Sequence, residues 1–556
     1  MKISILILLS WFFASGYSLA STSYEKFPVQ KKGGTFTDVL GMTPRTMVPM
    51  LATDVDSMEL GALFYLPLFG KDGQTWEDYP SLAEKLDISK DRKVYTYTLN
   101  AKARWSDGSP VTTDDVEYTF QKLMDPKTEA AALRSYYENV TFERVDGRTF
   151  RFKIEKPKFN TLTFLNEFQT IQKKQFEKEP DFNKSKEALK PVGNGPFRFK
   201  SLSRDQRVVV ERDQNWWAKD LPVFKARFNF DVIQFKIIQD PTLRYEKLLQ
   251  GEIDQTILTS DQFVTQVNGV DRERFGKTSN EGKKVWADKL KSSGPMGWLG
   301  MALNLKNPML ASVKTRKGLA YLIDYASITD KAFYGTMEQS VSPFNSASDN
   351  VHPSLKQAQN RYRFDPKKAA EFFEQDGWKK DPSSPVLVKE INGKKVPFKL
   401  QFKFPLGSPA QSKAAQMLKE VFKKQGVELE LRAMDTTALY KDFEDSNFEA
   451  MFMAWSGSME PDPKQLWSTD SMKGGSNKVS FSNPKVDALI QKANFEFNRK
   501  SRTKILQEIG KILYEELPYI FICERHFILQ GTNSRIKSPV WIEKFGSSSA
   551  KELFYE

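Results

Sequence analysis

Residues 398–434 hold the pattern that most constrains the fold of this chain. Two short runs in which apolar and polar residues alternate, FKLQFKF and VELELRAM, flank the longer segment SPAQSKAAQMLKEVFKKQG. Alternation with a period of two is typical of a β-strand, whereas Pro409 near the start of the segment and Gly426 at its end are typical of a helix. The pattern therefore predicts a strand, a helix and a second strand that together form a βαβ unit.

Strand and helix patterns alternate along most of the remaining sequence, which predicts an α/β fold. The chain has 556 residues, more than one hydrophobic core usually serves, so we expect two or three domains. Apolar residues make up 40% of the sequence and aromatic residues 13%. This composition supports large cores and excludes general disorder.

The first twenty residues differ from the rest of the chain. Lys2 is followed by the apolar run ISILILLSWFFASG, by YSLA and by the polar STS. This order predicts a signal peptide, residues 1–20, that is cleaved near Ala20. An N-terminal membrane anchor is the weaker alternative, because the apolar run is shorter than the roughly 20 residues that span a bilayer. No cysteine stands at the cleavage point, so we expect an exported, periplasmic protein that is not a lipoprotein.

The charge pattern and the cysteine content argue against nucleic-acid binding, disulfide bonds and metal binding. The net charge of +13 is spread over basic pairs that alternate with acidic residues, whereas a nucleic-acid binder would show a dense basic stripe. The single cysteine, Cys523, excludes an intramolecular disulfide and lies in the apolar run LPYIFICERHFIL, which predicts a buried strand with a core thiol. The sequence contains only two histidines, His352 and His526, in addition to this cysteine. Because these are few ligands for a transition metal, we expect no metal site and no cofactor.

Two turn-rich segments resemble functional sites, but a structural role explains each of them. In ARWSDGSPVTTDDVEYTFQKLM, residues 103–124, Asp107-Gly108 predicts a turn and Thr112 or Thr113 predicts the cap of a helix. We therefore interpret Trp105 and Asp107 as parts of the turn. The second segment, GNGPF, superficially resembles a phosphate loop, but no Lys-Ser/Thr follows it and it continues into a strand, so we reject phosphate binding.

These segments, in this order, resemble the family 5 extracellular solute-binding proteins, the peptide- and nickel-binding components of ABC importers. The resemblance rests first on a Trp-x-Asp-Gly-x-Pro turn before an Asp-Val helix, which matches Trp105, Asp107, Gly108, Pro110, Asp115 and Val116. GNGPFRF, GEID, FDPKKAAEFFEQDGW and SNPKVDALI resemble further family segments, so the match spans roughly residues 30 to 535. The stretch from Phe333 to Ser348 resembles the YejA-type branch.

The resemblance implies a type II-like, two-lobed (Venus-flytrap) α/β fold with an additional inserted domain. On this chain it implies lobe I at 30–70, 195–293 and 525–556, the inserted domain at 71–194, and lobe II at 294–524. It also implies a monomeric substrate-binding protein rather than an enzyme. Such a protein would capture oligopeptides or modified peptides between the lobes and deliver them to an ABC permease in the inner membrane.

The resemblance places the ligand beside MFMAWSGSMEPDPKQLW. Trp455 matches a pocket-side tryptophan of the family, Ser456 and Gly457 follow it, and Ser458 stands where peptide binders commonly carry an Asp that holds the amino terminus of the peptide. A buried ammonium group needs an ionised partner, which a serine cannot supply. Either Glu460 or Asp462 replaces that Asp, or the ligand has no free amino terminus: a capped peptide, a cell-wall fragment or an oligosaccharide.

Four other residues are candidates for lining the cleft. The glycines around Trp298 in GPMGWLG suggest an exposed ring that stacks on the ligand, with ordinary core packing as an equal alternative. Arg45 could form a bidentate pair with a carboxylate of the ligand. The default interpretation is that Arg45 is an ordinary solvated surface residue. The remaining two candidates are Tyr65 and Asn345.

Other function classes stay open at this point. A secreted hydrolase has little support, because His-Glu-x-x-His and Gly-x-Ser-x-Gly motifs are absent from the sequence, although a pair of carboxylates could still form in a cleft. Uptake of a metal chelate and a chaperone role are the remaining alternatives.

Overall fold

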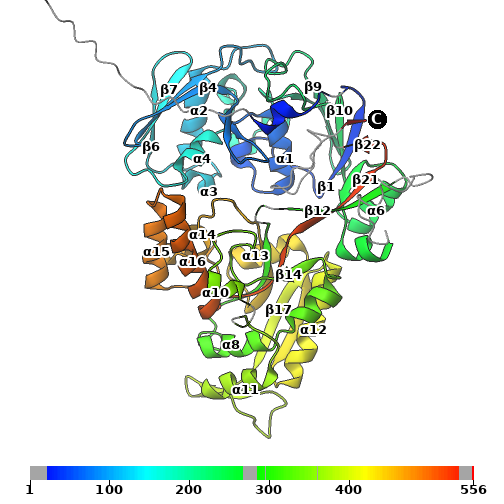
Figure 1. The fold of residues 1–556 in the computed structure, drawn as a ribbon, viewed down its shortest axis with the longest axis vertical. Coiled ribbons are helices and arrows are strands. Elements are labelled where there is room, and N and C mark those ends of the chain that lie inside the picture. The colour runs from blue at the N-terminus through cyan, green and yellow to red at the C-terminus, as the bar shows by residue number, and fades with distance from the viewer. Residues whose placement is uncertain are drawn as a thin grey trace, which may run out of the picture.

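The computed structural model describes residues 22–29, 31–266, 285–292, 294, 296–357, 359, 361–537 and 554–555 (Figure 1). The expected signal peptide and its cleavage point at Ala20 lie outside the described residues. None of the helices in the described ranges combines the length and the apolar character needed to cross a bilayer.

The first lobe contains a four-stranded sheet built from distant parts of the chain. Its strands, in spatial order, are β1 (Thr35–Leu40), β10 (Val232–Ile237), β9 (Arg207–Arg212) and β8 (Phe197–Ser203). β1 is parallel to β10, and the other neighbours are antiparallel. Helix α1 (Val55–Phe64) lies against β8.

Residues between β1 and β8 form a separate four-stranded antiparallel sheet, which we call the insert sheet. Its order is β4 (Ala83–Ile88), β5 (Val94–Leu99), β7 (Thr149–Ile154) and β6 (Val140–Arg144). Helix α2 (Thr113–Met124) begins after Thr112, whose side chain forms a reciprocal capping box with Asp115, so the predicted capped helix is confirmed. Trp105 is buried and its indole nitrogen donates to Asp115 Oδ2 at 3.2 Å. The same region contains β2 (Phe69–Lys71), β3 (Asp78–Pro80), α3 (Ala131–Arg134), α4 (Thr161–Asn166) and α5 (Lys173–Phe176).

The second lobe is built around a six-stranded mixed sheet. Its order is β14 (Met337–Gln339), β20 (Tyr519–Arg525), β13 (Trp298–Leu303), β19 (Ala450–Trp455), β17 (Lys399–Pro405) and β18 (Glu428–Met434). β17 and β18 are parallel, and α12 (Pro409–Lys424) connects them and packs on both. Gly426 follows α12 with φ at +76°, a conformation that favours glycine. The predicted βαβ unit is therefore confirmed.

Further helices surround this sheet. They are α8 (Val313–Tyr321), α9 (Tyr325–Ser327), α10 (Pro353–Lys356), α11 (Pro366–Gln375), α13 (Thr436–Glu444), α14 (Lys464–Trp467), α15 (Pro484–Asn494) and α16 (Arg499–Glu516). A hairpin, β15 (Val388–Ile391) and β16 (Lys394–Pro397), completes the lobe.

A third sheet lies where the chain passes between the lobes. It contains β11 (Gln255–Ile257), β21 (Phe527–Asn533) and β12 (Val285–Lys291), with α6 (Pro241–Leu249) against it (Figure 1). His526 alone separates β20 of the second lobe from β21 of the first. The run LPYIFICERHFIL is thus two strands of two different sheets, and the prediction of one strand is corrected. Backbone pairing with distant strands, rather than local sequence, decides where the break falls.

Three hydrophobic cores correspond to these sheets. One fills the second lobe, one is shared by the β1 sheet and the insert sheet, and a small one lies under β11, β12 and β21. The sheets are compatible with the lobes expected from the sequence, and the domain boundaries themselves remain a prediction. The chain passes from the second lobe toward the first at His526, between β20 and β21.

Candidate ligand-binding cleft

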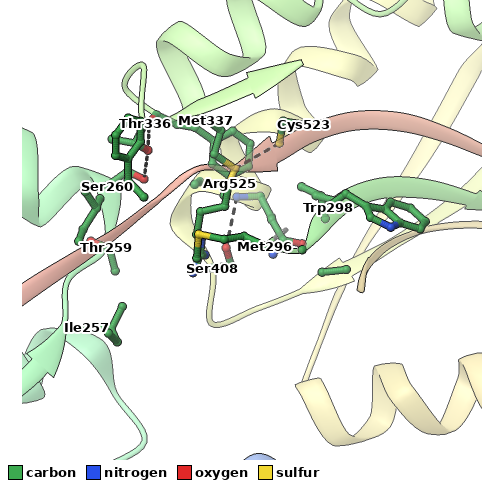
Figure 2. A pocket seen from close by; sticks show the side chains of 18 of the residues that line it. Ile257, Thr259, Ser260, Met296, Trp298, Thr336, Met337, Ser408, Cys523 and Arg525 are labelled. Carbon is green, nitrogen blue, oxygen red and sulfur yellow. Dashed lines mark hydrogen bonds between the residues drawn. The ribbon is translucent and has the colours of Figure 1, made fainter. Parts of the chain in front are cut away.

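A cavity of about 1060 Å³ lies between the two lobes. The first lobe contributes residues on α6 and after β11, and the second contributes the ends of β13, β19 and β20, the start of α12 and the loop before β14. Figure 2 shows Met296, Met337, Ser408 and Arg525 grouped on one side of the cavity, with Ile257 and Thr259 on another. Since residues of both lobes line it, a molecule bound there would contact both.

The segment after β19 reaches the cavity as expected from the resemblance. Trp455, Ser456, Gly457 and Ser458 all line it. β19 pairs with β13 so that Trp298 lies opposite Trp455, and a Cβ at Gly297 would lie only 2.2 Å from the carbonyl oxygen of Trp455. The absence of a side chain at Gly297 therefore lets the two strands approach at the edge of the cavity.

Glu460 and Asp462 lie outside the lining of the cavity. Glu460 Oε2 accepts a 2.9 Å hydrogen bond from Thr163, and Asp462 Oδ2 accepts one of 3.4 Å from Asn160, both in the insert beside α4. The guanidinium group of Arg502 is 3.8 Å from Glu460 and stacks 4.2 Å from the ring of Phe159. The two carboxylates join the second lobe to the insert, so the geometry gives no support to either as a substitute for the missing Asp.

Trp298 is among the residues that line the cavity, but its ring is not exposed, so the expectation of an exposed ring is corrected. Its side chain is 3% exposed and packs edge to face on Tyr519 and Phe521, with ring centroids 5.3 and 4.9 Å away. A Cβ at Gly300 would lie 2.8 Å from the ring of Trp298. The neighbouring glycine therefore makes room for the ring to fold back onto its own strand, which is the opposite of the expected effect.

Unlike Trp298, the remaining three candidates do not line the cavity. Asn345 is 1% exposed, and its side-chain nitrogen donates to the carbonyl oxygen of Arg525 at 3.1 Å. Tyr65 is fully buried at the end of α1, where burial raises the pKa of its hydroxyl. Arg45 is an exposed loop residue that does not line the cavity.

Four charged residues that line the cavity were missed at the level of sequence. They are Arg244, Asp261, Lys413 and Arg525. The guanidinium group of Arg525 is accessible from the cavity, while the surrounding protein lowers its pKa by desolvation. The charged pair Glu524-Arg525 in the middle of an apolar run was the available signal, because such an interruption is unusual in a buried strand.

Cys523 and the two histidines have structural surroundings. The thiol is buried, 3.3 Å from Met337 Sδ, and burial raises its pKa, as expected for a core thiol. His352 precedes α10 and faces Glu508 at 3.3 Å, whereas His526 faces Glu524 at 3.0 Å. Within the described ranges, no group of three or more His, Cys, Asp or Glu residues has metal-binding geometry.

His526 gives the crossing between the lobes a pH dependence. The hydrogen bond to Glu524 raises its pKa above 6.5, with Glu338 adding to the shift and burial and Lys291 opposing it. A raised pKa means that this contribution to stability is complete below about pH 6.5 and is lost as the pH rises through the pKa of the folded protein. We expect the difference in unfolding free energy between the wild type and His526→Asn, measured by urea unfolding, to shrink between about pH 6 and pH 9. A difference that is constant or grows over this range would contradict the assignment.

Comparisons with known proteins agree on one family. The sequence profile described as bacterial extracellular solute-binding proteins, family 5 (middle part), matches residues 77–477. The oligopeptide-binding protein AppA of Bacillus subtilis is 24% identical over 100% of this chain and 97% of its own length. The probable peptide-binding protein YejA of Agrobacterium fabrum is 24% identical over 87% of this chain and 83% of its own length.

Solved structures share the fold across nearly the whole chain. AppA from Bacillus subtilis in complex with a nonapeptide superposes with a TM-score of 0.80 at 22% identity, covering 95% of this chain and 99% of that one. NikZ from Campylobacter jejuni in complex with Ni(L-His) superposes with a TM-score of 0.74 at 21% identity, covering 92% and 95%. The two-lobed α/β architecture expected from the sequence is thereby confirmed.

Proposed function

Because the chain belongs to the family 5 extracellular solute-binding proteins, we propose that it captures oligopeptides or modified peptides between its lobes and delivers them to an ABC permease. The observation that carries this proposal is the cavity of about 1060 Å³ lined by both lobes. Ligand sites commonly measure about 300–1,000 Å³. The cavity is slightly larger than that range, which favours a ligand of several residues over a single amino acid.

Capture requires no chemistry on the ligand. A peptide that contacts both lobes stabilises their closed arrangement, and the closed form is the one that a permease can distinguish from the empty protein. The bonds from Thr163 to Glu460 and from Asn160 to Asp462 hold the second lobe against the insert and would add to that stabilisation. Among the described residues that line the cavity there is no histidine and one carboxylate, Asp261, so the lining gives the hydrolase alternative neither an imidazole nor a pair of carboxylates.

The proposal includes the location and the state of the protein. Export with cleavage near Ala20 would release a monomer on the outer side of the inner membrane, where the permease takes up its ligand. The relatives named as peptide-binding, AppA and YejA, support a peptide rather than an oligosaccharide as the ligand.

Native mass spectrometry of the mature protein, purified from its own compartment without refolding, tests the proposal. We expect an added mass that dissociates on activation and fragments with amino-acid spacing. Hexose or amino-sugar spacing would replace the peptide by a glycan or cell-wall fragment. A protein that carries no adduct and also fails to bind a mixed peptide library would contradict capture of peptides.

A further inference from the structure

We propose that Arg525 is the anchor for a carboxylate of the ligand, so that this protein holds its ligand by an anionic group rather than by an amino terminus. The inference rests on the proposed function and names the part of the ligand that the cavity recognises. It is carried by three observations: the state of the Arg525 side chain, the charges that line the cavity, and the residue at position 458.

The guanidinium group of Arg525 lines the cavity and has no counterion among the described residues. No carboxylate or other acceptor in this part of the chain forms an ion pair or hydrogen bond with it. Desolvation by the surrounding protein lowers its pKa, which means that the charged form is less stable there than in water. An anion in the cavity would stabilise the charged form of Arg525 again. A carboxylate suits this role because it accepts two parallel hydrogen bonds from the planar guanidinium group.

The main chain of Arg525 is held in place on both sides. Its amide donates to the carbonyl oxygen of Gly297 at 3.3 Å, and its carbonyl oxygen accepts from Asn345 Nδ2 at 3.1 Å. Met337 pairs with it across β14 and β20. Because the backbone is fixed by three elements, no ordering of the main chain is needed when the guanidinium group binds a ligand.

The charges that line the cavity favour an anion. Arg244, Lys413 and Arg525 are basic, whereas Asp261 is the single acidic residue among the described lining residues. Asp261 also accepts a hydrogen bond from the hydroxyl of Tyr334, which raises the pKa of that tyrosine. Asp38, Asp56 and Asp240, which lie outside the lining, offset the charge of Arg244. Lys413 and Arg525 therefore supply the positive charge that attracts ligands with a negative group.

Ser458 gives the cavity no partner for an ammonium group at this position. It lines the cavity after β19 and supplies no charge. Glu460 and Asp462, the nearest carboxylates along the chain, are bonded to the insert. The cavity therefore offers a strong site for a carboxylate and no comparable site for an ammonium group at this position.

The carboxylate can come from the carboxyl terminus of a peptide or from an acidic side chain. A set of synthetic pentapeptides distinguishes the two sources: one parent with a free carboxyl terminus and one Glu, its carboxyl-terminal amide, its Glu-to-Gln version and its amino-terminally acetylated version. Affinities are measured by calorimetry with the mature full-length protein. We expect the loss of one carboxylate, from one of the two sources, to weaken binding at least tenfold, and acetylation to have a smaller effect.

Arg525→Gln is the decisive variant and Arg204→Gln its matched control. Arg204 lies exposed in the turn between β8 and β9, outside the cavity. We expect Arg525→Gln to abolish the discrimination between the parent peptide and its neutralised version, Arg525→Lys to retain part of it, and Arg204→Gln to retain all of it. Retained discrimination in Arg525→Gln, or equal binding of all four peptides by the wild type, would overturn the anchor while leaving peptide capture intact. Failure of the wild type to bind any peptide would overturn the proposed function and the anchor with it.

Discussion

Replacing Trp378 with alanine is expected to destabilise the second lobe by about 3–5 kcal/mol, the range typical for removing a buried aromatic ring. Trp378 is 2% exposed and its ring stacks on Phe398 at 4.0 Å with an interplanar angle of 12°. Its indole nitrogen donates to Thr315 Oγ1 at 2.8 Å, which links the end of α11 to α8. Alanine would remove the stack and the hydrogen bond together and leave a cavity between these elements.

Urea unfolding followed by circular dichroism measures the loss, and Trp378→Phe separates its two parts. Phenylalanine keeps an aromatic ring against Phe398 but removes the donor to Thr315, so we expect a loss of roughly 1–2 kcal/mol. Two transitions are expected if the lobes unfold separately, and only the one assigned to the second lobe should move. An alanine variant that unfolds at the wild-type urea concentration would show that this stack does not support the lobe.

Features determined by neighbouring residues could be predicted from the sequence. The capping box at the start of α2 lies within four consecutive residues, Thr112 to Asp115. Asp240 caps α6 over the same distance, because its side chain accepts from the amide of Leu243. Gly251 stops α6 with φ at +74°. In each case the signal and the structure lie within one turn of helix, so no tertiary information is required.

Features determined by distant pairing could not be predicted. β20 and β21 are separated in sequence by His526 alone, yet β20 pairs with β13 and β14 whereas β21 pairs with β11 and β12. Nothing near His526 specifies which sheet each half joins. The pairing partners are far away in the sequence, and they alone decide where the chain passes from one lobe to the other.

The site was predictable only in part, for the same reason. The resemblance located Trp455 to Ser458, because these residues follow a strand that the family shares. It did not locate Arg525, whose access to the cavity depends on how the two lobes face each other. For Trp298, the expectation of an exposed ring was wrong. Adjacent glycines can leave a large ring exposed or make room for it in the core, and the packing on Tyr519 and Phe521 decides between the two.

The GNGPF segment yields the second large effect, because its glycines are required by a close approach of two backbones. A Cβ at Gly193 would lie 2.2 Å from the carbonyl oxygen of Phe64 at the end of α1, and the amide of Gly195 donates to that same oxygen at 2.7 Å. Between them, Asn194 accepts from the amide of Leu66 through its side chain at 2.8 Å. These hydrogen bonds hold the segment before β8 against the end of α1.

Gly193→Ala is therefore expected to cost about 3 kcal/mol, at the upper end of overpacking effects, because the clash is with backbone atoms that cannot rotate away. Gly147→Ala is the matched control, since a Cβ there has nothing within 4 Å, and it should change the unfolding free energy by less than about 0.5 kcal/mol. Urea unfolding of both variants gives the comparison. Equal losses in the two variants would mean that the approach to Phe64 is not what requires glycine at position 193. A large loss confined to Gly193→Ala would assign the motif a steric role in joining α1 to β8, a role that needs no phosphate or other ligand.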